Sequence, residues 1–216
     1  MPPMAISEIT AAFDAAVSSR RLLDHPYYRA WEAGALTVAD LAAYAAQYRH
    51  LEACLVEVLS DAARGAGDPA ARRLVEANLA DELGPTPHLD LFDGFAAAVG
   101  AERDAPSDAT ARLVTLYRDA AAAGPVAALA VVGAYETQAA DIASVKSASL
   151  QERYGLDGDA VAFWDLHARL ETLHGSWTSE ALTALGAETA VVEGLARRSA
   201  EAWWAFLDDR EAARAA

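Results

Sequence analysis

The sequence predicts an all-α fold, a single bundle of seven or eight helices. Apolar residues recur at three- and four-residue spacing almost from end to end, which is the period of an amphipathic helix. Alanine and leucine dominate, and runs of β-branched residues bounded by turn residues are missing. With 216 residues and 54% hydrophobic content, the chain can bury one substantial core and has no linker between two. We therefore expect residues 1–216 to form one domain.

Breaks rich in glycine and proline divide the chain into these helices. They fall at His25-Pro26, Gly34, 65–69, 84–87, 100–107, 124–125, 155–158 and 185–189. Thr37 and Asp68 stand where N-caps are expected, because a short polar side chain there accepts hydrogen bonds from the free amides of the first turn. Gly100 is expected to end a helix, since glycine readily takes the left-handed conformation of that position.

Composition excludes several classes of function. The chain has 32 acidic and 17 basic residues, and its formal net charge of −15 opposes binding to nucleic acid. The first residues lack the features of a signal peptide, and no apolar stretch of about 18 residues follows, so we expect a soluble cytoplasmic protein without a membrane partner. The single cysteine, Cys54, excludes a disulfide framework and is expected in the core.

The most informative motif lies within the helix expected over 159–184. His167, Glu171 and His174 are spaced i, i+4 and i+7, which places them on one face of a helix. Helical bundles hold iron or manganese pairs with a Glu-x-x-His pair of this kind. The alternative is that Glu171 lies on a solvated face and both histidines bond to backbone carbonyls. The apolar surroundings favour metal, because buried carboxylates persist only when paired or coordinated.

Other helices offer further candidate ligands. Glu82 closes one expected helix and His88 opens the next, across a Gly-Pro-x-Pro corner short enough for the two side chains to converge. They are equally consistent with surface positions at two helix ends. Glu136 follows ten uncharged residues, so either the helix reaches water there or the carboxylate is coordinated inside the bundle. For each of these residues, spacing alone leaves open both a surface position and a buried position at a metal.

Taken together, these segments resemble a known family. The strings are His25-Pro-Tyr-Tyr, Leu41-Ala-Ala-Tyr44, Asn78-Leu-Ala-Asp-Glu82 with His88, Tyr135-Glu136, and Phe163-x3-His167-x3-Glu171-x2-His174. In this order, over nearly the whole chain, they are similar to the heme-oxygenase-like diiron oxidases of the TenA and PqqC superfamily. The resemblance implies a ligand set of Glu82, His88, Glu136, His167, Glu171 and His174.

Two positions depart from the pattern of that family. The gap from Glu82 to His88 is one residue shorter than in the relatives, which leaves Asp81 as a rival of Glu82. Glu82 is preferred because the Asn-Leu-x-Asp-Glu string fixes the helix phase, so that the missing residue falls in the corner. Glu171 also stands where the family commonly has aspartate.

The resemblance also implies the chemistry. It implies two iron ions, with manganese as an alternative at one position, O2 as co-substrate and an external reductant. Members of the family N-oxygenate amines or cleave C–C bonds of amino or fatty acids, and one branch makes para-aminobenzoate from a tyrosine of its own chain. Similarity to that branch places Lys146, Tyr28, Tyr44 and Tyr135 near the metals. Otherwise Lys146 is a surface lysine and the tyrosines are core residues.

Three classes of function follow from these observations. The first is a diiron oxidase that acts on its own tyrosine or on a diffusing small amine, amino acid or fatty acid. The second is a metal-free relative of the TenA or PqqC kind, and the third is a noncatalytic helical module. Six aligned ligands disfavour the last two. The acidic surface and the pair Trp203-Trp204 on the last helix permit a homodimer.

Overall fold

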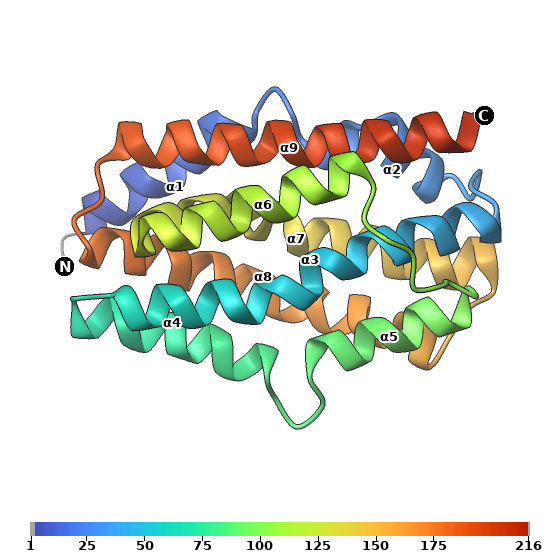
Figure 1. The fold of residues 1–216 in the computed structure, drawn as a ribbon, viewed down its shortest axis with the longest axis horizontal. Coiled ribbons are helices and arrows are strands. Elements are labelled where there is room, and N and C mark those ends of the chain that lie inside the picture. The colour runs from blue at the N-terminus through green and yellow to red at the C-terminus, as the bar shows by residue number, and fades with distance from the viewer. Residues whose placement is uncertain (1–2, 216) are drawn as a thin grey trace.

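The computed structural model describes residues 3–215 and has the form of an elongated helical bundle (Figure 1). Within that range the α-helices are α1 (Pro3–Val17), α2 (Pro26–Glu32), α3 (Val38–Gly65), α4 (Pro69–Glu82), α5 (His88–Ala98), α6 (Asp108–Ala123), α7 (Pro125–Tyr154), α8 (Asp159–Ala184) and α9 (Thr189–Ala215). A short 3₁₀ turn, η1 (Leu22–Asp24), precedes α2. The predicted all-α class is confirmed. The predicted number of helices, seven or eight, was too low. Every predicted break separates two helices, and one of these helices, α2, has only seven residues.

The helix ends follow the local chemistry of the sequence. Thr37 caps α3 by accepting a hydrogen bond from the amide of Asp40, whose carboxylate in turn accepts one from the amide of Thr37. Asp68 caps α4 by accepting from the amides of Ala70 and Ala71. Gly100, just beyond α5, has a φ of 73°, which side chains with a Cβ rarely adopt. These three predictions are confirmed.

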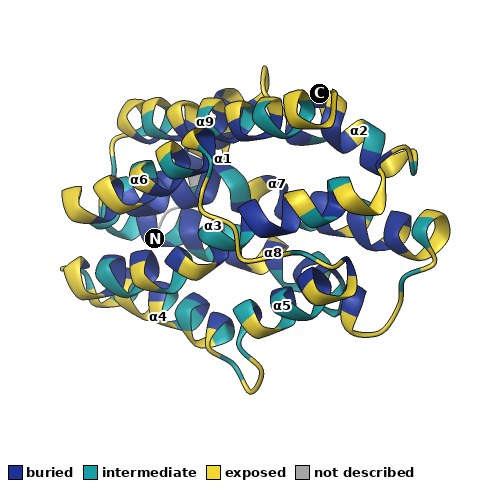
Figure 2. Ribbon diagram, turned by 45° about the vertical axis from the view of Figure 1, so that its right-hand side comes forward, coloured by how far each residue is buried: buried dark blue, intermediate teal, exposed yellow. Residues whose placement is uncertain are grey.

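Two long helices, α7 and α8, form the centre of the bundle and make its most extensive pairing. α9 crosses both α7 and α1, whereas α4 and α5 pack on α8 from the opposite side (Figure 1). The buried faces of the helices turn towards one another and the exposed faces turn outwards (Figure 2). Among the described residues, no helix is long and apolar enough to cross a membrane.

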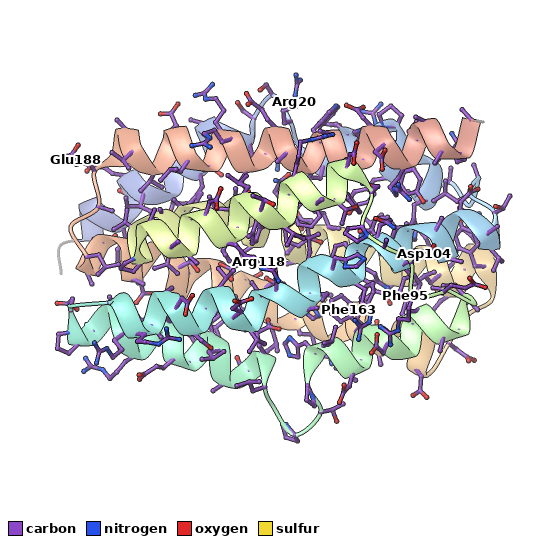
Figure 3. All side chains as sticks on the ribbon, in the orientation of Figure 1. Arg20, Phe95, Asp104, Arg118, Phe163 and Glu188 are labelled. Atoms are coloured by element: carbon purple, nitrogen blue, oxygen red, sulfur yellow. The ribbon has the colours of Figure 1, made fainter. Side chains whose placement is uncertain are left out.

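The interior is dense and aromatic. Phe95 and Phe163 lie inside the bundle, whereas Arg20 and Glu188 project from its surface (Figure 3). Cys54 is buried, as predicted. Trp203 is buried as well, at 2% exposure, so its side chain offers no surface to a second chain.

One glycine allows the helices around the site to approach closely. A Cβ at position 133 of α7 would lie 2.5 Å from the ring of Phe13 on α1 and 2.9 Å from the methyl group of Thr178 on α8. Glycine therefore fits where these three helices meet, one turn before Glu136.

Candidate functional site

The six candidate ligands come together in the interior as two triads. One consists of Glu82, His88 and His167, and the other of Glu136, Glu171 and His174. Within each triad, one ligand atom from every residue lies within 4.8 Å of the others, and all six residues are buried. The helical stripe at i, i+4 and i+7 thus supplies residues to both triads.

The first triad is built across the corner between α4 and α5. Glu82 is the last residue of α4 and His88 the first of α5, and Nδ1 of His88 lies 3.0 Å from Oε2 of Glu82. His167 on α8 completes the triad, its ring centroid 4.6 Å from that of His88. Nδ1 of His167 lies 2.8 Å from the carbonyl of Phe163, so this nitrogen carries the proton and Nε2 is free to bind a metal.

The second triad lies between α7 and α8. Both oxygens of Glu136 accept hydrogen bonds, from Nδ2 of Asn78 at 2.8 Å and from Oγ1 of Thr178 at 2.6 Å. Nδ1 of His174 is 3.9 Å from Oε2 of Glu171. Nε2 of His174 faces Oδ2 of Asp81 at 3.2 Å. Such a carboxylate partner orients a metal-binding imidazole.

The structure separates the two acidic candidates at the end of α4. Glu82 is buried and lies within the first triad, whereas the side chain of Asp81 is 37% exposed and contacts the outer nitrogen of His174. The shorter gap to His88 therefore falls in the corner of residues 83–87, outside the helix. The geometry places Glu82 within a candidate triad and Asp81 behind His174.

Burial and charge shift the pKa values of these groups. Burial alone would raise the pKa of Glu82, but the imidazoles of His88 and His167 outweigh it and hold the pKa below its ordinary value. Burial raises the pKa of Glu171 well above its ordinary value, and the carboxylates of Glu136 and Glu82 add to this. Burial also lowers the pKa of His167 to about 4, so its ring is neutral, as a metal ligand must be.

The donor atoms fit a pair of first-row metal ions. Nδ1 of His88 lies close to Glu82 but forms no hydrogen bond of acceptable geometry, and the buried Oε2 of Glu171 has no hydrogen-bond partner either. Two atoms that bind one ion at about 2.1 Å and at a right angle lie about 3 Å apart, which is the spacing seen at His88. Carboxylate oxygens and imidazole nitrogens suit iron and manganese. A divalent cation would also offset the repulsion among the buried carboxylates.

A second polar cluster lies in the same core. Nζ of Lys146, on α7, donates hydrogen bonds to the hydroxyls of Tyr28 at 3.0 Å and Tyr44 at 2.7 Å, and these hydroxyls are 2.8 Å from each other. The alternative that Lys146 is a surface lysine is wrong, because its side chain is buried. Ten residues along a helix from Glu136 turn a side chain about 80° away and carry it about 15 Å, so Lys146 faces α2 and α3 instead.

Aromatic rings enclose the amine of Lys146 on several sides. Its Nζ lies 4.2 Å from the ring centroid of Trp164, 4.3 Å from that of Tyr28 and 5.0 Å from that of Trp31. Lys146 is only 1% exposed, and burial lowers its pKa well below the ordinary value of a lysine. The Coulombic influence of Glu52 opposes this shift but is the weaker. Burial therefore favours the neutral, nucleophilic form of the amine.

A small cavity of ≈ 40 Å³ lies beside the two triads. Tyr48 and Tyr135 line it together with Glu136 and Glu171, and the hydroxyl of Tyr48 donates to that of Tyr135 at 3.0 Å. Tyr48 also stacks on Tyr44 with ring centroids 5.4 Å apart. The tyrosines thus form a continuous path from Lys146 to the carboxylates of the second triad.

Sequence reasoning assigned no role to several residues of the site. Glu52 on α3 lines the cavity, and burial raises its pKa to about 8. It follows Tyr44 and Tyr48 at four-residue intervals on one helical face, and that spacing could have revealed it. Asn78 lies one turn before Glu82 and could have been found in the same way. Thr178 lies one turn after His174 on the same face of α8, so its spacing could have revealed it as well. No local pattern marks Trp31, because Lys146 and Trp164 lie on other helices.

Comparison with known proteins agrees with this geometry. Residues 42–208 match the family described as iron-containing redox enzymes. A 4-aminobenzoate synthase from Nitrosomonas europaea is 34% identical over 95% of this chain and 92% of the relative. A 4-aminobenzoate synthase from Chlamydia muridarum is 29% identical over 94% of this chain and 92% of its own length.

Solved structures share the fold at low sequence identity. A CADD-like protein of unknown function from Nostoc punctiforme superposes with a TM-score of 0.77 and 17% identity, over 98% of this chain and 99% of the other. A TenA homologue from P. horikoshii gives a TM-score of 0.75 and 12% identity, over 94% of this chain and 97% of the other. Fold, ligand geometry and sequence similarity agree. The chain is an oxidoreductase and belongs to the family of iron-containing redox enzymes with a heme oxygenase-like fold.

Proposed function

We propose that this protein makes 4-aminobenzoate from its own Tyr28 and takes the nitrogen from Lys146. One observation carries the proposal: the amine of Lys146 is buried and lies 3.0 Å from the hydroxyl oxygen of Tyr28. The names of the relatives, 4-aminobenzoate synthases at 34% and 29% identity over almost the whole chain, support the same product.

The chemical relation between tyrosine and the product explains the arrangement. Both are benzene rings with two para substituents, a hydroxyl and a methylene in tyrosine and an amine and a carboxylate in the product. The ring C–O bond must give way to a C–N bond, with the phenol oxygen leaving as water. The Cε–Nζ bond of Lys146 must break, with Cε oxidised to an aldehyde. The Cα–Cβ bond of the tyrosine must break while Cβ is oxidised to the carboxyl carbon. O2 is the oxidant, and an external reductant supplies the further electrons that its reduction needs. The neutral amine of Lys146 is the nitrogen nearest to that C–O bond.

The metal centre belongs to the same proposal. The two triads would each hold one iron ion, with manganese as an alternative at one of them, and the bound metals would supply binding and reduction of O2. Glu136, fixed by Asn78 and Thr178, would keep its orientation as the charge of the site changes. Asp81 would hold the ring of His174 in place.

The protein residues between the two clusters would position the reacting groups and exclude water. Tyr44 bonds to both Lys146 and Tyr28, so it holds the amine against the ring that is to be converted. The dry aromatic walls keep the amine neutral. The rings of Tyr44, Tyr48 and Tyr135 give protons and electrons a short path between Tyr28 and the triads.

The size of the internal cavity favours a substrate taken from the chain itself. At ≈ 40 Å³ the cavity beside the triads has room for only a few water molecules, and not for an amino acid or a fatty acid. A diffusing substrate would require the aromatic wall to move. A substrate already built into the wall requires no such movement.

A single-turnover experiment tests the proposal. Purified protein is loaded with Fe(II) without oxygen, given reductant and O2 but no organic substrate, and analysed for product and for intact protein mass. We expect at most about one 4-aminobenzoate per chain, with loss of the ring from Tyr28 and of the nitrogen from Lys146, because a residue that is consumed is not renewed. Many turnovers that depend on an added amine, amino acid or fatty acid would contradict the proposal.

A further inference from the structure

A surface cleft leads to one of the two triads. It has a volume of ≈ 390 Å³, and residues of α1, α7 and α8 line it. Glu136 and Glu171 line this cleft and also the internal cavity of ≈ 40 Å³. The two carboxylates therefore separate the surface from the interior, whereas Glu82 and His167 line only the internal cavity.

The lining of the cleft suits a hydrated cation. Asp14 on α1 and Asp141 on α7 are exposed at its walls, and Thr10, Thr172 and Ser176 supply hydroxyl groups. Its lining residues include no lysine, arginine or aromatic side chain. Acidic walls raise the local concentration of cations and speed their association. An aromatic or fatty substrate would find no apolar surface of its own size there.

Glu171 differs from Glu136 in its freedom to receive an ion. Asn78 and Thr178 hold both oxygens of Glu136, but Oε2 of Glu171 is buried without a hydrogen-bond partner, in a residue that is 5% exposed. An unpartnered buried carboxylate oxygen is costly unless a ligand satisfies it. Here that oxygen belongs to a residue at the end of an acidic cleft.

We propose that this cleft is the route by which a divalent metal ion reaches and leaves the triad of Glu136, Glu171 and His174. Asp14 and Asp141 attract the hydrated ion, and Glu171 is the first ligand of the triad to bind it. The ion of the other triad has no such route and exchanges more slowly. The inference rests on the proposed function, since it requires that both triads bind metal.

Filling the cleft tests the route. A Cβ at Gly175 would lie 3.7 Å from the nearest backbone atom of Glu136, an ordinary contact, so Gly175→Leu adds bulk at the cleft without a clash at its first atom. Ser176→Trp fills the cleft from an exposed position. Gly194→Leu is the matched control, because it makes the same change in α9 with no atom within 4 Å of the new Cβ. Each protein is loaded anaerobically with Fe(II), and release to a chromogenic chelator is followed by stopped flow.

We expect the wild-type protein to release iron in two phases. Gly175→Leu and Ser176→Trp should each slow the faster phase by at least about tenfold. Gly194→Leu should change neither phase. Iron bound at equilibrium should stay the same in all of them, because a blocked route changes rates and not affinity. In Asp14→Asn with Asp141→Asn, loading of the faster site should slow and lose its dependence on ionic strength. A faster phase that both filling variants leave unchanged, or that Gly194→Leu slows equally, would overturn the route. Wild-type protein that binds no divalent metal would overturn the proposed function as well.

Discussion

The two polar clusters of this bundle are buried to a similar degree but are stabilised in opposite ways. One cluster, the metal end, consists of the two triads, in which carboxylates and imidazoles face one another. The other cluster, the tyrosine end, consists of Lys146 and the phenols and indoles around it, and its amine donates hydrogen bonds to Tyr28 and Tyr44. A cation from outside would complete the first arrangement, whereas in the second the amine already has hydrogen-bond partners in the chain.

The pKa shifts express the same contrast. Burial raises the pKa of Glu171 and lowers that of Lys146, so each group is driven towards its neutral form. At the metal end a bound ion would reverse the shift and keep the carboxylate charged. At the tyrosine end Glu52 opposes the shift only weakly, and the neutral amine is the form that the proposed chemistry at Tyr28 would use. Burial thus serves metal binding at one end and nucleophilicity at the other.

The largest expected effect comes from removing one candidate metal ligand. Replacing Glu171 or His174 by alanine removes a ligand, and we expect iron-dependent O2 consumption to fall by at least about 100-fold while most of the helix content remains. Leu173→Ala is the control, because Leu173 is an exposed residue of the same helix. Oxygen electrode traces and circular dichroism measure the two quantities. Full activity of either ligand variant would place the metals elsewhere.

Removing the hydroxyl of Tyr28 should abolish product formation without abolishing O2 consumption. In Tyr28→Phe the ring C–O bond is absent, so 4-aminobenzoate should disappear while O2 consumption at the metals stays within about twofold of the wild type. Tyr27→Phe is the control, because Tyr27 is equally buried but donates its hydroxyl to the carbonyl of Asp40, outside the Lys146 cluster. Product from Tyr28→Phe at the wild-type yield would show that this ring is not the source.

The dependence of stability on pH should distinguish the two ends in metal-free protein. Lys146 has a lowered pKa in the folded state, so the unfolded chain binds more protons and the free energy of unfolding rises with pH, between that pKa and about 10.4. Glu171 has a raised pKa, so the folded state binds more protons and the free energy of unfolding falls with pH, from about 4.3 up to that pKa.

Urea unfolding of metal-free protein at a series of pH values measures both contributions. Lys146→Met should remove the rising contribution and Glu171→Gln the falling one, each up to about 1.4 kcal/mol per pH unit. Saturating divalent metal should suppress the contribution of Glu171 and leave that of Lys146. Identical slopes in wild type and Lys146→Met would mean that the amine is charged in the fold.

The smallest expected effect comes from a substitution of Asp81, which contacts His174 from outside the triads. Asp81→Asn removes the charge that orients His174, and we expect metal affinity to weaken by about tenfold with both ions still bound at saturation. Glu82→Gln should instead lose one ion of the two. Metal content after dialysis measures this difference. Loss of an ion from Asp81→Asn but not from Glu82→Gln would reverse the assignment of ligand and orienting residue.

The contrast between the two ends also shows what the sequence could reveal. Local patterns predicted the fold and brought out the metal end, because His167, Glu171 and His174 lie on one helical face and Glu82 and His88 flank one short corner. Glycine and proline marked the helix ends for the same local reason. The roles of these residues as ligands remain a prediction that the metal experiments test.

The tyrosine end could not be read from any single helix. Lys146 meets Tyr28 and Tyr44 only because α7 packs against α2 and α3, and those contacts join residues more than a hundred positions apart. Resemblance to a family named these residues, but their spacing in the sequence does not show that they are in contact. Glu52 was missed although its spacing from Tyr48 was visible, because a lone carboxylate in a helix usually faces water.

Isotope labelling identifies the source of the ring and of the nitrogen in the product. The protein is produced with ring-¹³C tyrosine and, separately, with ε-¹⁵N lysine, freed of small molecules, loaded with Fe(II), and given reductant and O2. We expect 4-aminobenzoate to carry the ¹³C ring in the first sample and ¹⁵N in the second, at no more than about one molecule per chain. Unlabelled product, or O2 consumed at the metals without any labelled product, would contradict it.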